Sequence, residues 1–193
     1  IIAIALSVMQ NDFEMSVPMV GLLGMGTLAG MIIGGLVGGY FTDILGRKKM
    51  FIIDMLLLGV FTTAQFFVTD PMQLVVLRLL IGIALGTDYP IAGSLMSEFA
   101  PKKHRGALLG GINAFWFIGY AISYLVGYFM LPLGADSWRW MLLSGALPII
   151  FLLLARLNMP ESPHWLTKQG KSVEAAQIVK KIFGDDVVVS NTI

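Results

Sequence analysis

A chain of 193 residues in which 56% are hydrophobic and only 13% are charged has too few charges for a soluble domain, which would carry about a quarter. The formal net charge of +1 conceals an uneven distribution of charges along the chain. Cysteine is absent, which excludes disulfides, thiol chemistry and zinc sites built on cysteine.

Apolar runs long enough to cross a bilayer follow one another along the chain. Residues 1–10 are apolar but too few to cross, so they are interpreted as the end of a first helix that starts before Ile1. A polar loop is predicted at residues 11–16. Five full spans are then predicted at residues 17–40, 50–68, 71–95, 107–131 and 138–157. The predicted fold class is an all-α membrane protein whose first helix is truncated.

The charges between the spans predict an orientation in the membrane. One side carries almost all the cations, which are Arg47, Lys48, Lys49, Lys102, Lys103, Arg105, Arg156, Lys168, Lys171, Lys180 and Lys181. The other side holds Asp12, Glu14, Asp70, Asp136 and a single cation, Arg139. The basic side is expected to face the cytoplasm, which places the amino terminus and residues 159–193 there.

Beyond residue 158 the composition changes. Two prolines, Pro160 and Pro163, break the last span, and Ser172 has the position of an N-cap for a short helix that ends before Gly184. The apolar residues of this segment form one stripe, which predicts a helix lying on a protein or membrane surface. We therefore divide the chain into a helix bundle, 1–158, and a cytoplasmic linker with short amphipathic helices, 159–193. A partly ordered tail is the alternative.

Four motifs occur in order at the ends of the predicted spans. They are Gly39-x-x-x-Asp43-x-x-Gly46-Arg47-Lys48-Lys49, Arg78-x-x-x-Gly82, Glu98-x-x-Pro101-x-x-x-Arg105-Gly106 and Pro160-Glu161-Ser162-Pro163-x-Trp165-Leu166. Together they resemble the sugar porters and the related phosphate:proton symporters of the major facilitator superfamily. The resemblance implies the amino-terminal six-helix half, a 3+3 inverted repeat, of a twelve-helix transporter whose carboxy-terminal half is missing here.

The resemblance also implies a cytoplasmic gating latch, in which charge pairs hold the two halves together and break as the protein opens inward. By their positions in the motifs, its members are Asp43, Gly46, Arg47, Glu98, Arg105 and Glu161. From the residues alone, the first motif could equally be a loop that only sets topology, in which Gly46 permits a tight turn and the cations stay in water.

Arg78 lies about 10 Å along its helix from the Asp70-Pro71 start, inside the hydrocarbon region. A guanidinium at that depth is costly, so it is by default a functional residue. Snorkelling to the outer interface is the alternative. In proton-coupled sugar porters the arginine here pairs with an aspartate of the first helix, a position that would fall before Ile1.

Asp88, Tyr89 and Pro90 form a second polar site in the same span. Pro90 cannot donate to the carbonyl of Gly86, so a kink is predicted there. Phosphate porters carry a similar run, whose acid and tyrosine contribute to the substrate site. On a helix, Tyr89 falls within about 20° of Arg78 and Asp88 about 80° away. Tyr89 is thus the stronger candidate for lining the same cavity as Arg78, and Asp88 could instead pair with a polar group on a neighbouring helix.

Three residues of the fifth span, Asn113, Trp116 and Tyr120, share one helix face. Sugar porters or phosphate porters have glutamine at the matching positions. The changes argue against a sugar or phosphate substrate and allow an aromatic or less hydroxyl-rich molecule. A packing stripe is the alternative. The glycines that recur along the second span and in the fifth are assigned to close helix packing.

These features predict a secondary active transporter that moves a small polar metabolite, sugar-like or an organic or inorganic anion, by alternating access. It is expected to be coupled to protons, with the proton gradient as driving force and without a cofactor. Expected partners are the substrate, the bilayer and the missing half, with no nucleic acid. The sequence has no nucleophile triad or metal-ligand cluster that would indicate an enzyme. An uncoupled facilitator, and a non-transporting receptor or scaffold, are the alternatives.

Overall fold

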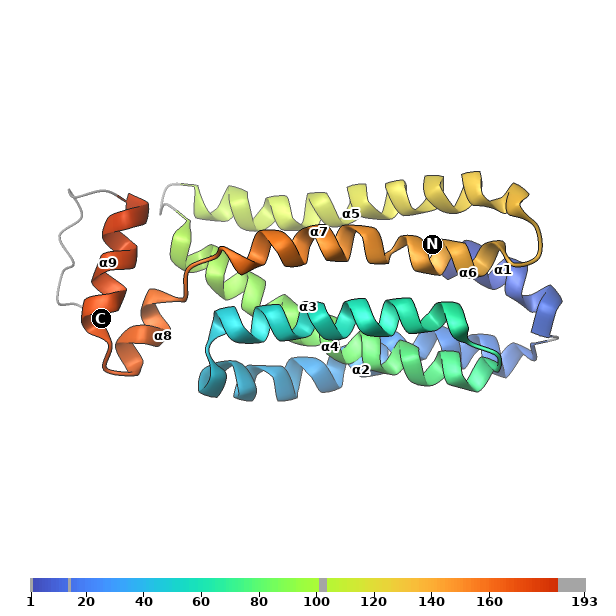
Figure 1. The fold of residues 1–193 in the computed structure, drawn as a ribbon, viewed down its shortest axis with the longest axis horizontal. Helices are drawn as coiled ribbons and strands as arrows, with labels where there is room; N and C mark the ends of the chain where they lie inside the picture. The colour runs from blue at the N-terminus through green and yellow to red at the C-terminus, as the bar shows by residue number, and fades with distance from the viewer. Residues whose placement is uncertain (1, 14, 101–103, 184–193) are drawn as a thin grey trace.

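The computed structural model describes residues 2–13, 15–100 and 104–183, and the side chains of Asn11, Asp12, Ser97, Arg105 and Phe183 lie outside the description. Every regular element in these ranges is helical (Figure 1). The elements are α1 (Ile2–Phe13), α2 (Val17–Leu45), α3 (Arg47–Ala64), η1 (Gln65–Phe67), α4 (Pro71–Phe99), α5 (Arg105–Met130), η2 (Leu131–Leu133), α6 (Ser137–Ser144), α7 (Ala146–Leu157), α8 (Pro163–Lys168) and α9 (Ser172–Phe183).

Five helical segments are long and apolar enough to cross a membrane, which confirms the predicted all-α membrane fold. The last of them, Ser137–Leu157, consists of α6 and α7, which are separated at Gly145. Several predicted boundaries were wrong, since α2 continues to Leu45 instead of residue 40 and α4 to Phe99 instead of residue 95. Helix α1 continues to Phe13, so the loop expected from residue 11 starts later, because polar residues are compatible with the final turn of a helix.

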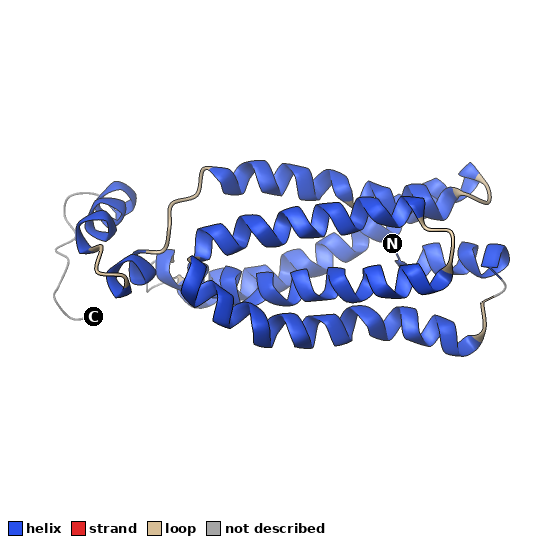
Figure 2. Ribbon diagram, turned by 60° about the horizontal axis from the view of Figure 1, so that its bottom comes forward, coloured by secondary structure: helices blue, strands red, loops and turns tan. Residues whose placement is uncertain are grey.

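The connections alternate between two ends of the bundle, and α8 and α9 lie beyond one of these ends (Figures 1 and 2). That end also holds the start of α3, because the backbone N–H of Lys48 donates to Glu161 just before α8, at 2.9 Å. Asp70 and Asp136 lie at the opposite end, where each precedes a helix that runs back through the bundle. The basic and the acidic connections of the sequence therefore lie at opposite ends of the bundle. That the basic end faces the cytoplasm stays a prediction.

Helices α2 and α4 pack backbone against backbone along a seam of small residues. A Cβ atom on Gly34 would lie 2.8 Å from the Cα of Ile83, and one on Gly82 would lie 2.9 Å from the Cα of Gly30. Thr87 adds a hydrogen bond by donating to the carbonyl of Gly34 at 3.2 Å. The predicted packing role of the α2 glycines is confirmed.

The glycines of α5 do not behave in the same way. A Cβ atom on Gly106, Gly110 or Gly119 would meet nothing within 4 Å in the part of the chain that the structure describes. Their assignment to packing was wrong within this bundle, because α5 turns an open, largely apolar face away from the other described helices.

Candidate functional site

Arg78 of α4 lines a partly open cavity of about 190 Å³ between the helices of the bundle. The other lining residues come from α1, α3, η1, α4, α6, α7 and the α6–α7 junction, and are Ile2, Thr62, Gln65, Ile81, Leu142, Gly145 and Ile149. Helix α4 is fixed at its start by Asp70, whose side chain accepts a hydrogen bond from the Met72 N–H at 2.6 Å, and by Pro71 in the first turn.

Two residues that line this cavity each carry a buried polar atom that has no hydrogen-bond partner within the described part of the chain. One is a donor, Nε of Arg78, and the other is an acceptor, Oε1 of Gln65. Native interiors satisfy almost all such atoms, and the exceptions usually accommodate water, an ion or a reacting group. The cavity is therefore lined by two polar side chains, Arg78 and Gln65, that each keep an unfilled hydrogen-bonding position.

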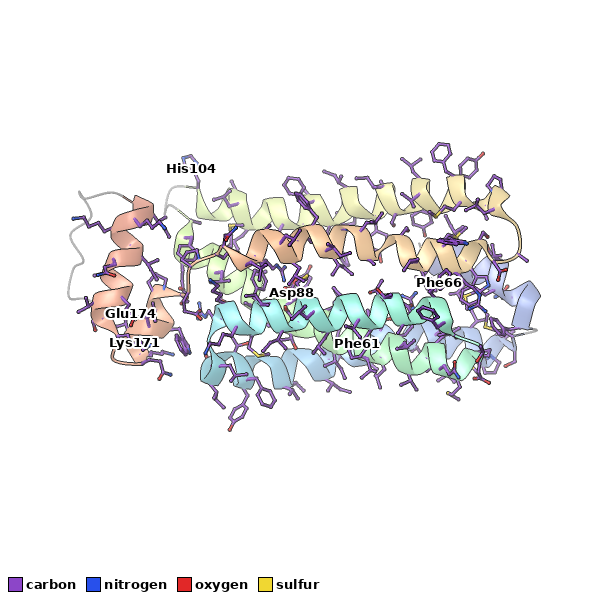
Figure 3. The ribbon with its side chains drawn as sticks, in the orientation of Figure 1. Phe61, Phe66, Asp88, His104, Lys171 and Glu174 are labelled. Carbon is purple, nitrogen blue, oxygen red and sulfur yellow. The ribbon has the colours of Figure 1, made fainter. Side chains whose placement is uncertain are left out.

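Asp88, predicted either for the substrate pathway or for a contact with a neighbouring helix, makes the helix contact. Its carboxyl accepts a hydrogen bond from Arg156 of α7 at 2.8 Å, and Figure 3 shows it between α7 and α3. The same guanidinium nitrogen lies 3.7 Å from Asp54 of α3 and donates to the carbonyl of Phe51 at 3.2 Å. Helix α4 continues through Pro90 to Phe99, and the kink expected at Pro90 stays a prediction.

Arg156 was predicted to lie among the cations between the spans, and this prediction was wrong. Only 11% of its side chain is exposed, because it reaches back from the last turn of α7 to two carboxylates inside the bundle. Asp54 was missed, although the signal was present: it is the fifth residue of the predicted span 50–68, and an acid inside an apolar span is by default functional.

Tyr89 and the predicted residues of α5 lie on open faces. Trp116 and Tyr120 stack edge to face, with ring centroids 5.3 Å apart, beside an open cavity of about 300 Å³ that also includes Ile2 and Ser123. Asn113 is exposed on α5, and Tyr89 is 47% exposed on α4. In the described part of the chain, Arg78 thus lies close to Gln65. The four other predicted pathway residues, Tyr89, Asn113, Trp116 and Tyr120, lie on open faces where a ligand or another part of the full-length protein can contact them.

The predicted latch residues gather at the basic end of the bundle. Arg47 at the start of α3 forms an ion pair with Glu98 at the end of α4, and Glu98 also accepts a hydrogen bond from Ser162 at 2.6 Å. Glu161 accepts the Lys48 N–H, and it lies so close to Gly46 that a Cβ there would be 2.7 Å from Oε2. The φ of Gly46 is 97°, a conformation that favours glycine.

Asp43 joins this cluster through its backbone, since its carbonyl accepts a hydrogen bond from the Trp165 ring N–H at 2.9 Å. The remaining member, Arg105, begins α5, and its side chain lies outside the described residues. The contacts tie the α2–α3 turn, the end of α4 and α8 together within this half of the protein. The breaking of contacts between halves stays a prediction.

We expect Glu98→Gln to lower the free energy of unfolding of the full-length protein by about 1.5–3 kcal/mol, because Arg47 loses a charged partner while largely buried. Glu174→Gln is the matched control. Its carboxylate lies 3.8 Å from Lys171 with both side chains more than half exposed, so the cost should stay below about 0.5 kcal/mol. Unfolding curves of both variants check this, and equal costs would contradict a structural role for the Arg47–Glu98 pair.

Comparison with known proteins gives consistent matches over nearly the whole chain. The family model described as "Sugar (and other) transporter" matches residues 6–192. The metabolite transport protein YaaU of Escherichia coli is 41% identical over 96% of this chain and 42% of its own length. The inner membrane metabolite transport protein YgcS of the same organism is 41% identical over 91% of this chain and 39% of its own length.

A solved structure of the xylose transporter XylE, a member of the major facilitator superfamily, has a TM-score of 0.86 at 26% identity and covers 95% of this chain and 46% of that one. The chain therefore spans less than half the length of the relatives it matches. With its five apolar spans and its motifs, this chain belongs to the sugar (and other) transporter family of the major facilitator superfamily and corresponds to the amino-terminal half of its members.

Proposed function

We propose that the full-length protein is a secondary active transporter that moves a small polar metabolite by alternating access and couples this movement to protons. The observation that carries the proposal is the pair of unpartnered atoms, Arg78 Nε and Gln65 Oε1, on two residues that line one cavity between the helices. An uncompensated cation inside a membrane bundle calls for an anionic partner, which is either a carboxylate of the protein or an anionic group of the substrate.

Two relatives support proton coupling by their names. One is an arabinose-proton symporter of Bacillus subtilis, 28% identical to this chain. The other is XylE, whose solved structure is described as that of a proton:xylose symporter. In this proposal a proton binds to an acid that faces Arg78, and the arginine favours the ionised form of that acid once the substrate has left.

The substrate class that we propose is a sugar-like molecule or a small organic anion. Trp116 and Tyr120 present their aromatic rings to a cavity that Ile2 also lines. Ile2 lines the Arg78 cavity as well, so the two cavities are neighbours. An aromatic surface together with a cation suits a carboxylic acid as well as a sugar ring. Among the relatives, one is named as a cis,cis-muconate transport protein and one as a niacin transporter, both of Acinetobacter baylyi and both 30% identical.

The rest of the arrangement follows from the topology. The basic end, with α8 and α9, faces the cytoplasm, and the open faces of α4 and α5 meet the carboxy-terminal half. Catalysis of a covalent reaction is not proposed, because the relatives are named as transport proteins. An uncoupled facilitator of the same fold is the second candidate, favoured if no acid faces Arg78 in the full-length protein.

The test is uptake by the full-length protein in proteoliposomes, with sugars and small carboxylic acids offered under an imposed pH gradient. We expect accumulation of one substrate above its outside concentration, which disappears when a protonophore collapses the gradient. Equilibration without accumulation would identify a facilitator. Binding without flux would identify a receptor.

A further inference from the structure

The charged network formed by Asp54, Asp88 and Arg156 lies away from the Arg78 cavity, and its members come from α3, α4 and α7. Asp54 is 3% exposed, and the Arg156 guanidinium stacks on the Phe51 ring with its central carbon 3.4 Å from the ring centroid. The surroundings of Asp54 along α3 are the apolar, buried side chains of Phe51, Met55 and Leu58. Water is therefore largely excluded from Asp54, while the side chain of Asp88 is 20% exposed, so a net charge on the Asp54 side of the network is costly.

The network has one positive group for two acids. With both carboxyls ionised, it carries a net charge of −1. The ion pairs of Asp54 and Asp88 are both made with the same nitrogen of Arg156, at 3.7 Å and 2.8 Å. Oδ1 of Asp54 also accepts a hydrogen bond from the backbone N–H of Met55 at 2.6 Å. Its second oxygen, Oδ2, is buried without a hydrogen-bond partner among the described residues.

The two carboxyl groups meet at the same nitrogen of Arg156, Asp54 through Oδ1 at 3.7 Å and Asp88 through Oδ1 at 2.8 Å. Two ionised carboxyls are both acceptors and repel each other, whereas a carboxylic acid also has an O–H that donates. A single proton would therefore remove the net charge and occupy the free oxygen at the same time.

Other charged groups near the network come from α2, α3 and α4. On α3, Arg47, Lys48 and Lys49 occupy the first turn, roughly 8–10 Å along the axis from Asp54. Arg47 is already paired with Glu98 of α4, about 15 Å along α4 from Asp88. Arg78 lies about the same distance away in the other direction. Asp43, at the end of α2, is exposed.

We propose that Asp54 and Asp88 together bind one proton, which makes a second proton site separate from the Arg78 cavity. The proton comes from water and returns to water; one O–H bond forms, a carboxylate becomes a carboxylic acid, and no other bond changes. Arg156 holds the remaining negative charge. The number of protons bound is set by neutrality of the network, and this rule does not depend on the proposed transport activity.

Neutrality gives a different proton count for each variant. The native network binds one proton. Asp54→Asn and Asp88→Asn each leave one acid opposite one arginine, so each variant binds none. Arg156→Gln leaves two acids without a cation, so it binds two. A purely structural ion-pair network, with both acids ionised in every variant, would give zero protons throughout.

The experiment is infrared spectroscopy of the purified full-length protein at neutral pH, which measures the C=O stretch of protonated carboxyls in difference spectra against each variant. We expect both asparagine variants to lose the same band, and Arg156→Gln to gain a band of similar size. Asp43→Asn, on an exposed carboxyl, is the control and should change nothing. Gel filtration verifies that each variant is folded.

A spectrum that is identical in the native protein and in both asparagine variants would overturn the proposal. So would an Arg156→Gln variant that is folded and gains no band. If one asparagine variant fails to fold, the other carries the same test, since the rule predicts the same loss for both. The readout needs no substrate, so a failed transport screen and a failed proton count are separate results.

Discussion

Gly34→Ala in the full-length protein is expected to lower the free energy of unfolding by about 1–3 kcal/mol or more. The added Cβ would overlap the carbonyl of Ile83 and lie 2.8 Å from its Cα. These are backbone atoms, so no side chain can rotate away, and α2 and α4 would have to separate along the seam that also contains Gly30 and Gly82. The measurement is thermal or denaturant unfolding in detergent.

Gly24→Ala is the matched control for this prediction, because Gly24 lies on the same helix and a Cβ there would meet nothing within 4 Å. It should unfold like the native protein. Gly34→Leu should be worse than Gly34→Ala and should fail to give a monodisperse protein. If Gly34→Ala unfolds at the same point as Gly24→Ala, the close contact between α2 and α4 is absent in the membrane protein.

The sequence predicted the spans and the glycine seam well because both depend on local, periodic patterns. A hydrocarbon core admits few charges, so apolar runs define the helices directly, and glycines four residues apart define a helix face. The partner of that face was harder to identify. It is α4, and Gly82 and Gly86 of α4 also lie four residues apart, which would have been the signal.

The charged sites were predicted less well because their meaning depends on partners that are distant in sequence. Arg156 stands at the end of a span, where counting charges assigns it to the loop, yet its long side chain reaches Asp88, 68 residues earlier in the chain. No local pattern distinguishes a cation that points to water from one that reaches inward. As a result, the depth of Arg78 was predicted from the sequence and that of Arg156, whose side chain is 11% exposed, was not.

The two deep arginines differ in what surrounds them, and this difference predicts different roles. Arg156 has Asp88, Asp54 and a backbone carbonyl as partners. Arg78 has a buried Nε without a partner in the described residues, beside an equally unpartnered oxygen of Gln65. A satisfied arginine stabilises the bundle, whereas an unsatisfied one in a cavity is available for an anion or an acid that comes and goes during transport.

Arg78→Gln is therefore expected to abolish accumulation driven by a pH gradient, while the protein stays folded and still binds substrate. A gradient of one pH unit stores about 1.4 kcal/mol per proton, which supports about a tenfold accumulation in one-proton symport. The ratio of inside to outside substrate should fall from that level to about one in the variant. Arg78→Lys, which keeps the positive charge, is the matched control and should retain part of the accumulation.

The measurement is uptake into proteoliposomes with and without the gradient, together with substrate binding on the same preparation. The separation of these two readouts is what identifies the role of Arg78. Glutamine at position 78 can still donate and accept hydrogen bonds beside Gln65, so substrate binding survives. It carries no charge to favour the ionised form of a facing acid. The acid therefore keeps its proton, and the gradient no longer drives transport. A variant that still concentrates substrate in response to the gradient would make Arg78 a structural residue and would favour a coupling site elsewhere, with the Asp54–Asp88 pair as the next candidate.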